Sequence, residues 1–209
     1  QDIMKNLNLS LYLVTDENDD VEKFLKTIED AINGGVSVVQ IREKTKDTLD
    51  FYNLALKVKE ITAKYNVPLI INDRVDVALA IDADGVHIGP SDMPCDVTCK
   101  LVGPNKIVGV SAATIDEAKK AEKDGADYIG TGAVFPTATK EDAPKITKND
   151  LKEIVESINI PVVAIGGITL DNASELTDTG IKGLSVVSAI MSSDNPRESA
   201  EKLLNIFNS

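Results

Sequence analysis

The sequence predicts an α/β protein, a single-domain (β/α)8 TIM barrel over residues 4–209, from three observations. Short runs rich in β-branched residues alternate with amphipathic helical stretches along the whole chain, a pattern typical of βα units around a parallel sheet. Eight such units can be counted. Polar residues gather at the carboxyl ends of most strands, where barrel active sites are built. An open doubly wound sheet is the alternative, but no G-x-G-x-x-G follows the first strand.

The strands are expected where the β-branched runs lie. The first helical stretch shows the outer layer: Val21, Phe24 and Ile28 fall on one stripe, and Gly34 marks the end of the helix. This helix should therefore cover the outside of the sheet. In chain order, the expected strands are residues 11–15, 36–42, 68–73, 85–89, 106–111, 128–135, 161–168 and 184–190.

Composition fits an ordinary globular protein, with 43% apolar and 27% charged residues in a chain of 209. The sequence contains no apolar run of about 18 residues, the length needed to cross a bilayer. Its net charge of -12 argues against nucleic acid or anionic membrane as a partner. We expect a cytoplasmic protein. Residues 1–3 are expected to be a processing or cloning remnant before Met4. Cys95 and Cys99 lie one turn apart without a nearby histidine, so a reduced pair is favoured over a zinc site.

The second expected strand ends in alternating polar residues. Gln40, Arg42 and Lys44 are spaced two apart, so an extended chain places all three on one face. A strand edge facing water is the alternative. The apolar residues between them disfavour it, because parallel strands are covered on both faces.

The next two strands each lead to an aspartate. Asp73 ends the third strand, and Asp92 lies in the loop after the fourth, so adjacent strands should bring them together. Two carboxylates without Cys or His suit Mg2+, which is commonly bound by one or two carboxylates plus substrate phosphate. The alternative is that each aspartate caps the following helix.

His87 and Ser111 occupy the fourth and fifth strands. His87, the sole histidine, lies among apolar neighbours, so we expect a hydrogen-bonded structural role and leave open a supporting role near the site. Ser111 has no His or Lys base in its motif and is not expected to be an acyl-transfer nucleophile. It either donates to a phosphate or a charged intermediate, or caps the helix that begins near Ile115.

The last three strands carry groups suited to phosphate. Thr137, Thr139 and Lys140 offer two hydroxyls and an ammonium within four residues, with a solvated turn as the alternative. Gly166 and Gly167 follow the seventh strand, and the loops after strands 7 and 8 bind phosphate in many barrels.

Six motifs in order resemble the thiamin-phosphate synthase (thiamin-phosphate pyrophosphorylase) family over nearly the whole chain: Q-I-R-E-K at 40–44, I-N-D at 71–73, A-D-G-V-H-I-G-x-x-D-x-P at 83–94, G-V-S at 109–111, F-P-T-A-T-K at 135–140 and I-G-G-I at 165–168. The resemblance implies a transferase that joins a pyrimidine diphosphate to a thiazole phosphate through a pyrimidine cation and releases pyrophosphate. It implies that Gln40, Arg42, Lys44, Asn72, Ser111 and Lys140 hold the pyrimidine diphosphate, with Arg42, Lys44, Ser111 and Lys140 catalytic. It further implies that Asp73 and Asp92 bind Mg2+, and that Thr137, Thr139, Gly167, Val187 and Ser188 hold the thiazole phosphate.

Three positions depart from the family pattern: Pro90 stands where Gln is common, Ala133 where Pro is frequent, and Ala113 where His is often found. Ala113 bears on the nearest alternative function. The resemblance extends to the related thiazole tautomerases, which share the barrel and are expected to use a histidine near this position. A non-catalytic regulator that binds thiamin precursors is a third alternative. A homo-oligomer is compatible with the sequence.

Overall fold

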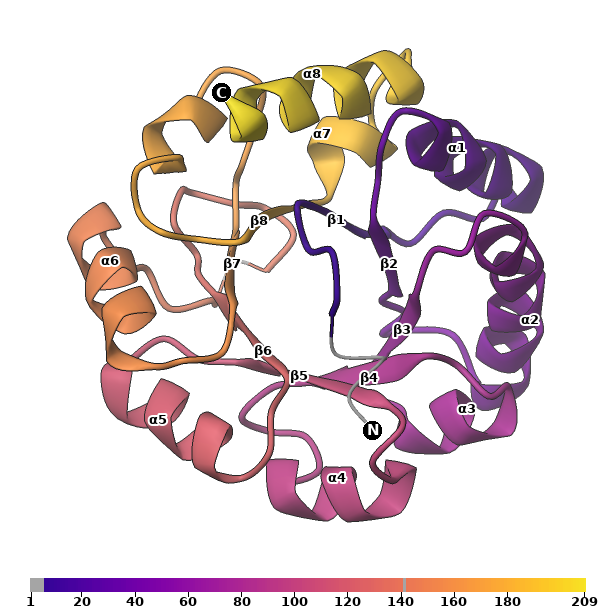
Figure 1. Cartoon of the computed structure of the whole chain (residues 1–209). Helices are drawn as coiled ribbons and strands as arrows, with labels where there is room; N and C mark the ends of the chain where they lie inside the picture. The colour runs from indigo at the N-terminus through magenta and orange to yellow at the C-terminus, as the bar shows by residue number, and fades with distance from the viewer. Residues whose placement is uncertain (1–5, 141) are drawn as a thin grey trace.

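The computed structural model describes residues 6–140 and 142–209, so the expected remnant at residues 1–3 lies outside the described residues. Eight parallel strands close into a barrel in chain order, with β8 pairing back onto β1. Figure 1 shows the ring of strands inside a ring of helices. The predicted (β/α)8 barrel is thereby confirmed. The strands are β1 (Leu11–Val14), β2 (Val38–Ile41), β3 (Leu69–Asn72), β4 (Gly85–Ile88), β5 (Ile107–Ser111), β6 (Tyr128–Thr131), β7 (Val162–Ile165) and β8 (Gly183–Val186).

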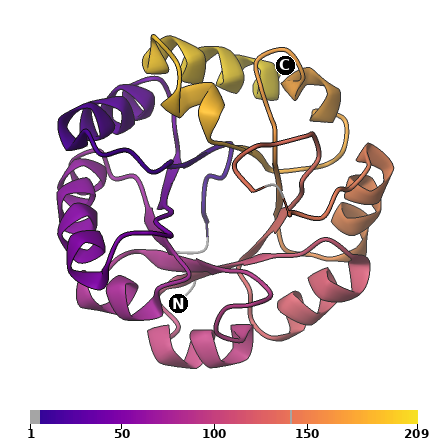
Figure 2. The same ribbon diagram turned by 180° about the vertical axis from the view of Figure 1, so that it is seen from behind.

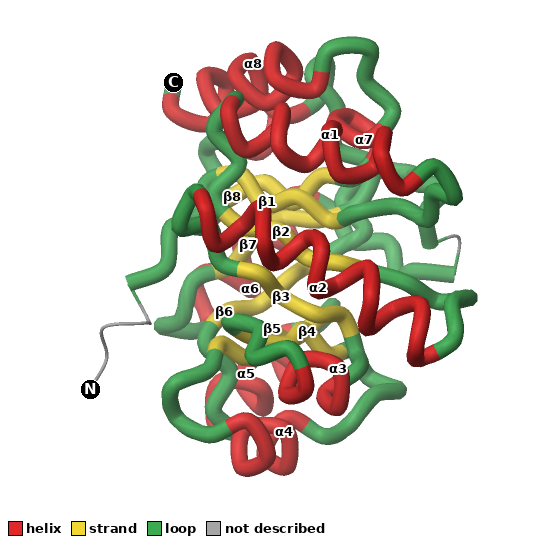
Figure 3. Tube along the Cα trace, turned by 90° about the vertical axis from the view of Figure 1, so that its right-hand side faces the viewer, coloured by secondary structure: helices red, strands yellow, loops and turns green. Residues whose placement is uncertain are grey.

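Helices cover the outside of the barrel, as the side and rear views show (Figures 2 and 3). The first of them buries the predicted stripe, including Phe24 and Ile28, and the Asp20 side chain caps it by accepting from the Lys23 N–H. No described helix combines the length and apolarity needed to span a membrane. The helices are α1 (Val21–Asn33), α2 (Thr48–Lys64), α3 (Val75–Ala80), α4 (Cys95–Val102), α5 (Ile115–Lys123), α6 (Lys148–Ser157), the 3-10 helix η2 (Ala173–Leu176), α7 (Ser188–Met191) and α8 (Pro196–Asn208).

Three strand ends were predicted three or four residues too far along the chain; one of them is the strand expected at 161–168, which ends at Ile165. The strand expected at 184–190 ends at Val186, and α7 begins at Ser188 because the Met191 N–H donates back to the Val187 carbonyl. The strand expected at 128–135 ends at Thr131. Beyond it, the consecutive N–H groups of residues 134 and 135 donate to the carbonyls of residues 165 and 166, whereas a parallel ladder uses alternate residues.

Alternation along the strands divides the core into two parts. Outward-facing strand residues pack against the helices, while inward-facing residues fill the barrel. The interior nearer the amino ends of the strands is mostly apolar: Val38, Ile70, Ile107 and Val163 pack there with tyrosines from β1 and β6. Toward the carboxyl ends of the strands the interior becomes polar, so the fold places its polar groups at that rim.

Candidate functional site

Basic residues follow β2 and are held by the tip of β1. The Arg42 N–H donates to Thr15 Oγ1 at 3.2 Å, and Glu17 Oε1 accepts from the N–H groups of Lys44 (2.6 Å) and Thr45 (3.0 Å). Hydrogen bonds from these two backbone groups lower the pKa of Glu17. The turn that carries Arg42 and Lys44 is therefore fixed by backbone hydrogen bonds, while the Lys44 side chain stays partly exposed.

The two predicted aspartates meet beside this turn. Asp73 and Asp92 are close neighbours: burial first, and then the nearby Asp92 carboxyl group, raise the pKa of Asp73. Lys44 Nζ lies 4.0 Å from Asp73 Oδ2. The Asp73 backbone has φ +64° and donates its N–H to the His87 carbonyl of β4 at 2.8 Å. Two acids, Arg42 and Lys44 thus share one side of the rim, which we call the charged half.

Neither aspartate caps a helix. The cap position of α3 is Arg74, that of α4 is Pro94, and neither end has a side-chain cap. Asp92 Oδ2 instead accepts from the Gly89 N–H at 2.8 Å. The helix-cap alternative is therefore wrong for both acids.

The charged half suits a hard cation. Within the described residues, no group of three or more His, Cys, Asp or Glu side chains could hold a metal. A cation between Asp73 and Asp92 would therefore need further oxygen ligands from water or a bound phosphate, which is how Mg2+ is usually held. It would also relieve the repulsion between the two carboxylates, so these residues fit the predicted ion.

Amide side chains lie inside the barrel just below the charged half. Asn72 Nδ2 donates to Gln40 Oε1 at 2.9 Å, and Gln40 Nε2 donates to the Tyr12 hydroxyl at 2.7 Å. Asn72 Oδ1 is buried without a hydrogen-bond partner in the structure. The predicted pair of amides is thus brought together, with one acceptor left for a ligand.

Ser111 is connected to the same interior through histidine. Its Oγ lies 2.8 Å from His87 Nε2, while His87 Nδ1 lies 2.9 Å from the Tyr128 hydroxyl. Burial lowers the pKa of His87 to about 4, so the ring is neutral at pH 7. Thr114 caps α5, and the helix-cap alternative for Ser111 is wrong. His87 is the hydrogen-bonded histidine that was predicted, next to a predicted site residue.

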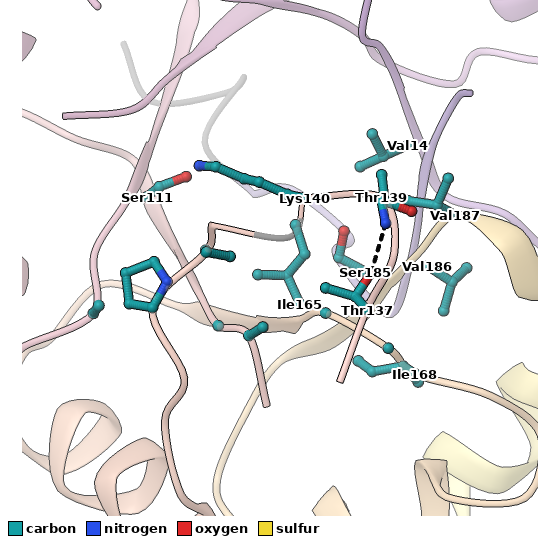
Figure 4. Close-up of a pocket in the computed structure, with 18 of the residues that line it drawn as sticks. Val14, Ser111, Thr137, Thr139, Lys140, Ile165, Ile168, Ser185, Val186 and Val187 are labelled. Carbon is teal, nitrogen blue, oxygen red and sulfur yellow. Dashed lines mark hydrogen bonds between the residues drawn. The ribbon is translucent and has the colours of Figure 1, made fainter. Parts of the chain in front are cut away.

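A pocket that is open to solvent lies over the opposite side of the rim. Figure 4 shows Lys140 extending across it toward the side where Ser111 lies, and the Thr139 N–H donating to Thr137 Oγ1 (3.2 Å). Gln40, Lys44, Asn72 and both aspartates do not line it. Of the predicted residues, the pocket is lined by Arg42, Ser111, Thr137, Thr139, Lys140, Gly167, Val187 and Ser188.

Uncharged groups line this side, which we call the neutral half: Thr137, Thr139, Gly167, Val187 and Ser188. Its loops pack closely. Gly167 has φ +64°, and a Cβ there would lie 2.3 Å from the Pro136 carbonyl oxygen. Asn172 Nδ2 donates to the Gly167 carbonyl at 2.9 Å. Only glycine fits this conformation and spacing without strain, which keeps the backbone beside the pocket.

Sequence reasoning missed three interior residues. Tyr12 and Tyr128 lie 2.5 Å apart through their hydroxyls and complete the polar interior. The Ser185 hydroxyl lines the pocket, buried and without a hydrogen-bond partner in the structure. Strand alternation could have found Ser185, since the strand expected at 184–190 places Ser185 two residues before Val187 and on the same face.

The cysteines are placed as predicted. Cys95 and Cys99 are half-buried on α4 and form no disulfide. Burial, followed by the neighbouring Cys99, raises the pKa of Cys95 to about 12. A thiol that stays protonated at neutral pH is a poor nucleophile and metal ligand, which fits the reduced Cys95 that was predicted.

Comparison with known proteins gives consistent matches. Residues 11–190 match the family model described as thiamine monophosphate synthase. The thiamine-phosphate synthase of Methanobrevibacter smithii is 67% identical over 204 residues, 98% of each chain. That of Alkaliphilus oremlandii is 55% identical, covering 94% of this chain and 95% of its own. The solved thiamine phosphate pyrophosphorylase of Pyrococcus furiosus superposes with a TM-score of 0.87 at 41% identity, over 98% of each chain.

Proposed function

The chain belongs to the thiamine monophosphate synthase family, and on that premise we propose how its rim makes thiamin phosphate. The substrates are 4-amino-2-methyl-5-(diphosphooxymethyl)pyrimidine and 4-methyl-5-(2-phosphoethyl)thiazole or its carboxylate. The second product is pyrophosphate, and the carboxylate would in addition release CO2. One observation carries the proposal. The charged half, with its paired acids and Lys44, adjoins a pocket that is lined by Arg42 and Lys140 as well as by the neutral half. A diphosphate and a monophosphate could therefore be bound side by side.

The reaction needs no protein nucleophile. The bond between the pyrimidine methylene carbon and the diphosphate oxygen breaks, and its electron pair leaves with the diphosphate. The resulting pyrimidine cation is captured by the lone pair of the thiazole nitrogen, which forms the new C–N bond. The site must neutralise the leaving group, align two substrates and exclude water.

The charged half and Lys140 would neutralise the leaving group. Arg42 and Lys44 follow β2, and Lys140 reaches over from the β6 loop. Asp73 and Asp92 would hold Mg2+, which when bound supplies positive charge to the diphosphate oxygens. These assignments rest on the proximity of the acids to Lys44 and on their unrelieved repulsion.

The uncharged groups would position the two rings. Gln40 and Asn72 would bind the aminopyrimidine, where the unpartnered Asn72 Oδ1 could accept from the exocyclic amine. The neutral half would hold the thiazole phosphate through hydroxyl and backbone N–H donors, a mode common after strands 7 and 8 of barrels. Ser111 and Lys140, between the two, would contact the departing diphosphate.

The alternatives fit the site less well. A tautomerase would need a proton-transfer group in place of Ala113, which lines the pocket and whose methyl group cannot move a proton. A non-catalytic regulator would not require paired acids beside three basic side chains. Neither alternative is favoured by the relatives.

The direct test combines the pyrimidine diphosphate, the thiazole phosphate and Mg2+ with the protein. We expect thiamin phosphate and pyrophosphate in equal amounts, measured by chromatography and a phosphate-release assay. Omitting either substrate or chelating the metal should abolish both products. Conversion of the thiazole alone would instead identify an isomerase, and binding without products a regulator. Running the carboxylated and decarboxylated thiazole phosphates in parallel gives the preferred acceptor.

Self-association and location also belong to the proposal. Val97 and Leu101 are exposed and four apart on α4, and Met93 is exposed just before that helix. Val97 and Leu101 therefore share one helix face that a second copy of the chain could cover. Light scattering after size exclusion measures the assembly, and Val97→Lys should favour the monomer. A cytoplasmic location fits substrates whose phosphate groups prevent unaided passage through membranes.

A further inference from the structure

A continuous chain of hydrogen bonds crosses the barrel interior and links two parts of the proposed site. It runs from Asn72 through Gln40 to Tyr12, and from there to its other end at Ser111. Its middle members are almost fully buried: Tyr12 is 1% exposed and Tyr128 0%. Barrel interiors are usually filled by branched apolar side chains, and burying polar groups is costly unless all are paired. The chain therefore calls for an explanation beyond packing.

The amide end sets the direction of the chain. Gln40 Oε1 accepts from Asn72, so Gln40 Nε2 donates to the Tyr12 oxygen. The Tyr12 hydrogen must then point to its other partner, the Tyr128 oxygen at 2.5 Å. Each hydroxyl can donate only one hydrogen, so Tyr128 in turn donates its own to His87 Nδ1.

This direction fixes the histidine tautomer. A neutral ring that accepts at Nδ1 carries its hydrogen at Nε2, which donates to Ser111 Oγ at 2.8 Å. A doubly protonated ring would donate at both nitrogens and would leave the buried Tyr12 hydrogen without an acceptor. The hydrogen of Ser111 is consequently free to point into the pocket.

The chemistry of the proposed substrate agrees with this direction. Exchanging oxygen and nitrogen in both amides would reverse every bond in the chain, and Ser111 would then offer only lone pairs. Diphosphate oxygens also only accept, so that arrangement would be repulsive. In the direction given by the structure, Ser111 offers a donor on the side toward which Lys140 extends, and Asn72 offers the acceptor Oδ1.

We propose that His87, Tyr128 and Tyr12 are positioning residues that act through Ser111, holding its hydroxyl as a hydrogen-bond donor to the departing diphosphate. The inference rests on the proposed function. None of the three needs to touch a substrate. They keep one uncharged donor aligned where negative charge develops. Stabilising that charge with fixed donors contributes a large part of the rate enhancement in such reactions.

The direct test is the nitrogen spectrum of the histidine side chain. His87 is the only histidine in the sequence, so labelling histidine with 15N gives one unambiguous pair of ring signals. We expect the Nε2–H tautomer in the substrate-free protein at pH 7. The Nδ1–H tautomer, or a protonated ring, would overturn the proposal whether or not the protein makes thiamin phosphate.

A double-mutant cycle tests the path to Ser111. Tyr128→Phe should lower kcat about tenfold, the equivalent of misplacing one hydrogen bond, with little change in KM for the thiazole phosphate. In a Ser111→Ala background the same substitution should have no further effect. Tyr52→Phe on α2, partly buried outside the barrel, is the matched control and should leave kcat unchanged.

The outcomes separate the two levels of the argument. If the effects of Tyr128→Phe and Ser111→Ala multiply, Tyr128 acts elsewhere and the proposal fails while the synthase activity stands. Should Tyr128→Phe fold poorly, the tautomer of the unsubstituted protein still decides the matter. If the unsubstituted protein makes no thiamin phosphate, the proposed function fails, and the nitrogen spectrum alone reports the direction of the hydrogen bonds inside the barrel.

Discussion

The two halves of the rim differ in chemistry, although each is proposed to bind a phosphate group. The charged half carries Arg42, Lys44 and two neighbouring acids, and the side chains of Lys44 and Asp73 are partly exposed. The neutral half has no charged member and is built on loops so tightly packed that Gly167 cannot carry a side chain. The difference fits two tasks: a diphosphate whose charge grows as it leaves needs ions, whereas a monophosphate that is merely held needs fixed donors. Substitutions should accordingly alter kcat on one side and KM on the other.

Asp73→Asn should have the largest effect, because it removes half of the proposed cation site. We expect Mg2+-dependent turnover to fall by roughly a thousandfold, measured as initial rate against Mg2+ concentration. Asp76→Asn is the matched control, since Asp76 lies nearby on α3 but is paired with Arg74 at 2.7 Å. Unchanged rates in Asp73→Asn would refute the metal assignment.

Lys140→Ala tests whether a cation from the neutral side serves the leaving group. We expect kcat to fall about a hundredfold, with little change in the melting temperature because the side chain is exposed. Lys145→Ala, exposed on the same loop, is the control. A variant that lost its fold would point to a structural lysine instead, and a change confined to KM for the thiazole would move Lys140 into the neutral half.

Gly167→Ala should affect binding more than chemistry. The new methyl group would meet the Pro136 carbonyl oxygen and force the loop away from the pocket, so KM for the thiazole phosphate should rise about tenfold. Gly103→Ala is the control, because Gly103 also has positive φ (+84°) but nothing within 4 Å of the added carbon. Equal effects of the two substitutions on KM would show that backbone strain, not the pocket, is responsible.

The smallest expected effect concerns pH and the buried His87, the hydrogen-bond partner of Ser111. Burial lowers its pKa to about 4, so the ring stays neutral and kcat should show no inflection from it between pH 6 and 8. Unfolded histidine titrates near 6.5. The unfolded state therefore binds the proton first, and folding stability from this group is full above pH 6.5 and is lost as pH falls toward 4. An inflection near pH 6.5 that His87→Gln abolishes would contradict this.

Much of the fold follows from the sequence, because each strand is a separate β-branched run. The errors lie where apolar residues continue past a strand end, as after Thr131 and Val186, since composition does not show where the ladder stops. The rim positions of Arg42, Lys44 and Asp73 also follow, because parallel strands bring their carboxyl ends to one edge.

The chain of hydrogen bonds inside the barrel, from Asn72 to Ser111, could not be predicted in the same way. A tyrosine within an apolar strand looks like packing, and the Tyr12–Tyr128 contact joins residues 116 positions apart. Only closure of the barrel places β1 and β6 across the same interior. The hydrogen-bond partners of His87 lie on β5 and β6, the next two strands of the sheet. Its local sequence indicated a structural histidine but could not name these partners, because they come from other strands.

The pairing of β8 with β1 has a consequence for synthesis of the chain. The first strand to leave the ribosome gains its second neighbour only when the last strand has emerged, so its open edge must wait through nearly the whole of translation. Unpaired strand edges are prone to intermolecular association. Slowing translation late in the message should thus prolong the interval in which nascent chains are vulnerable to aggregation.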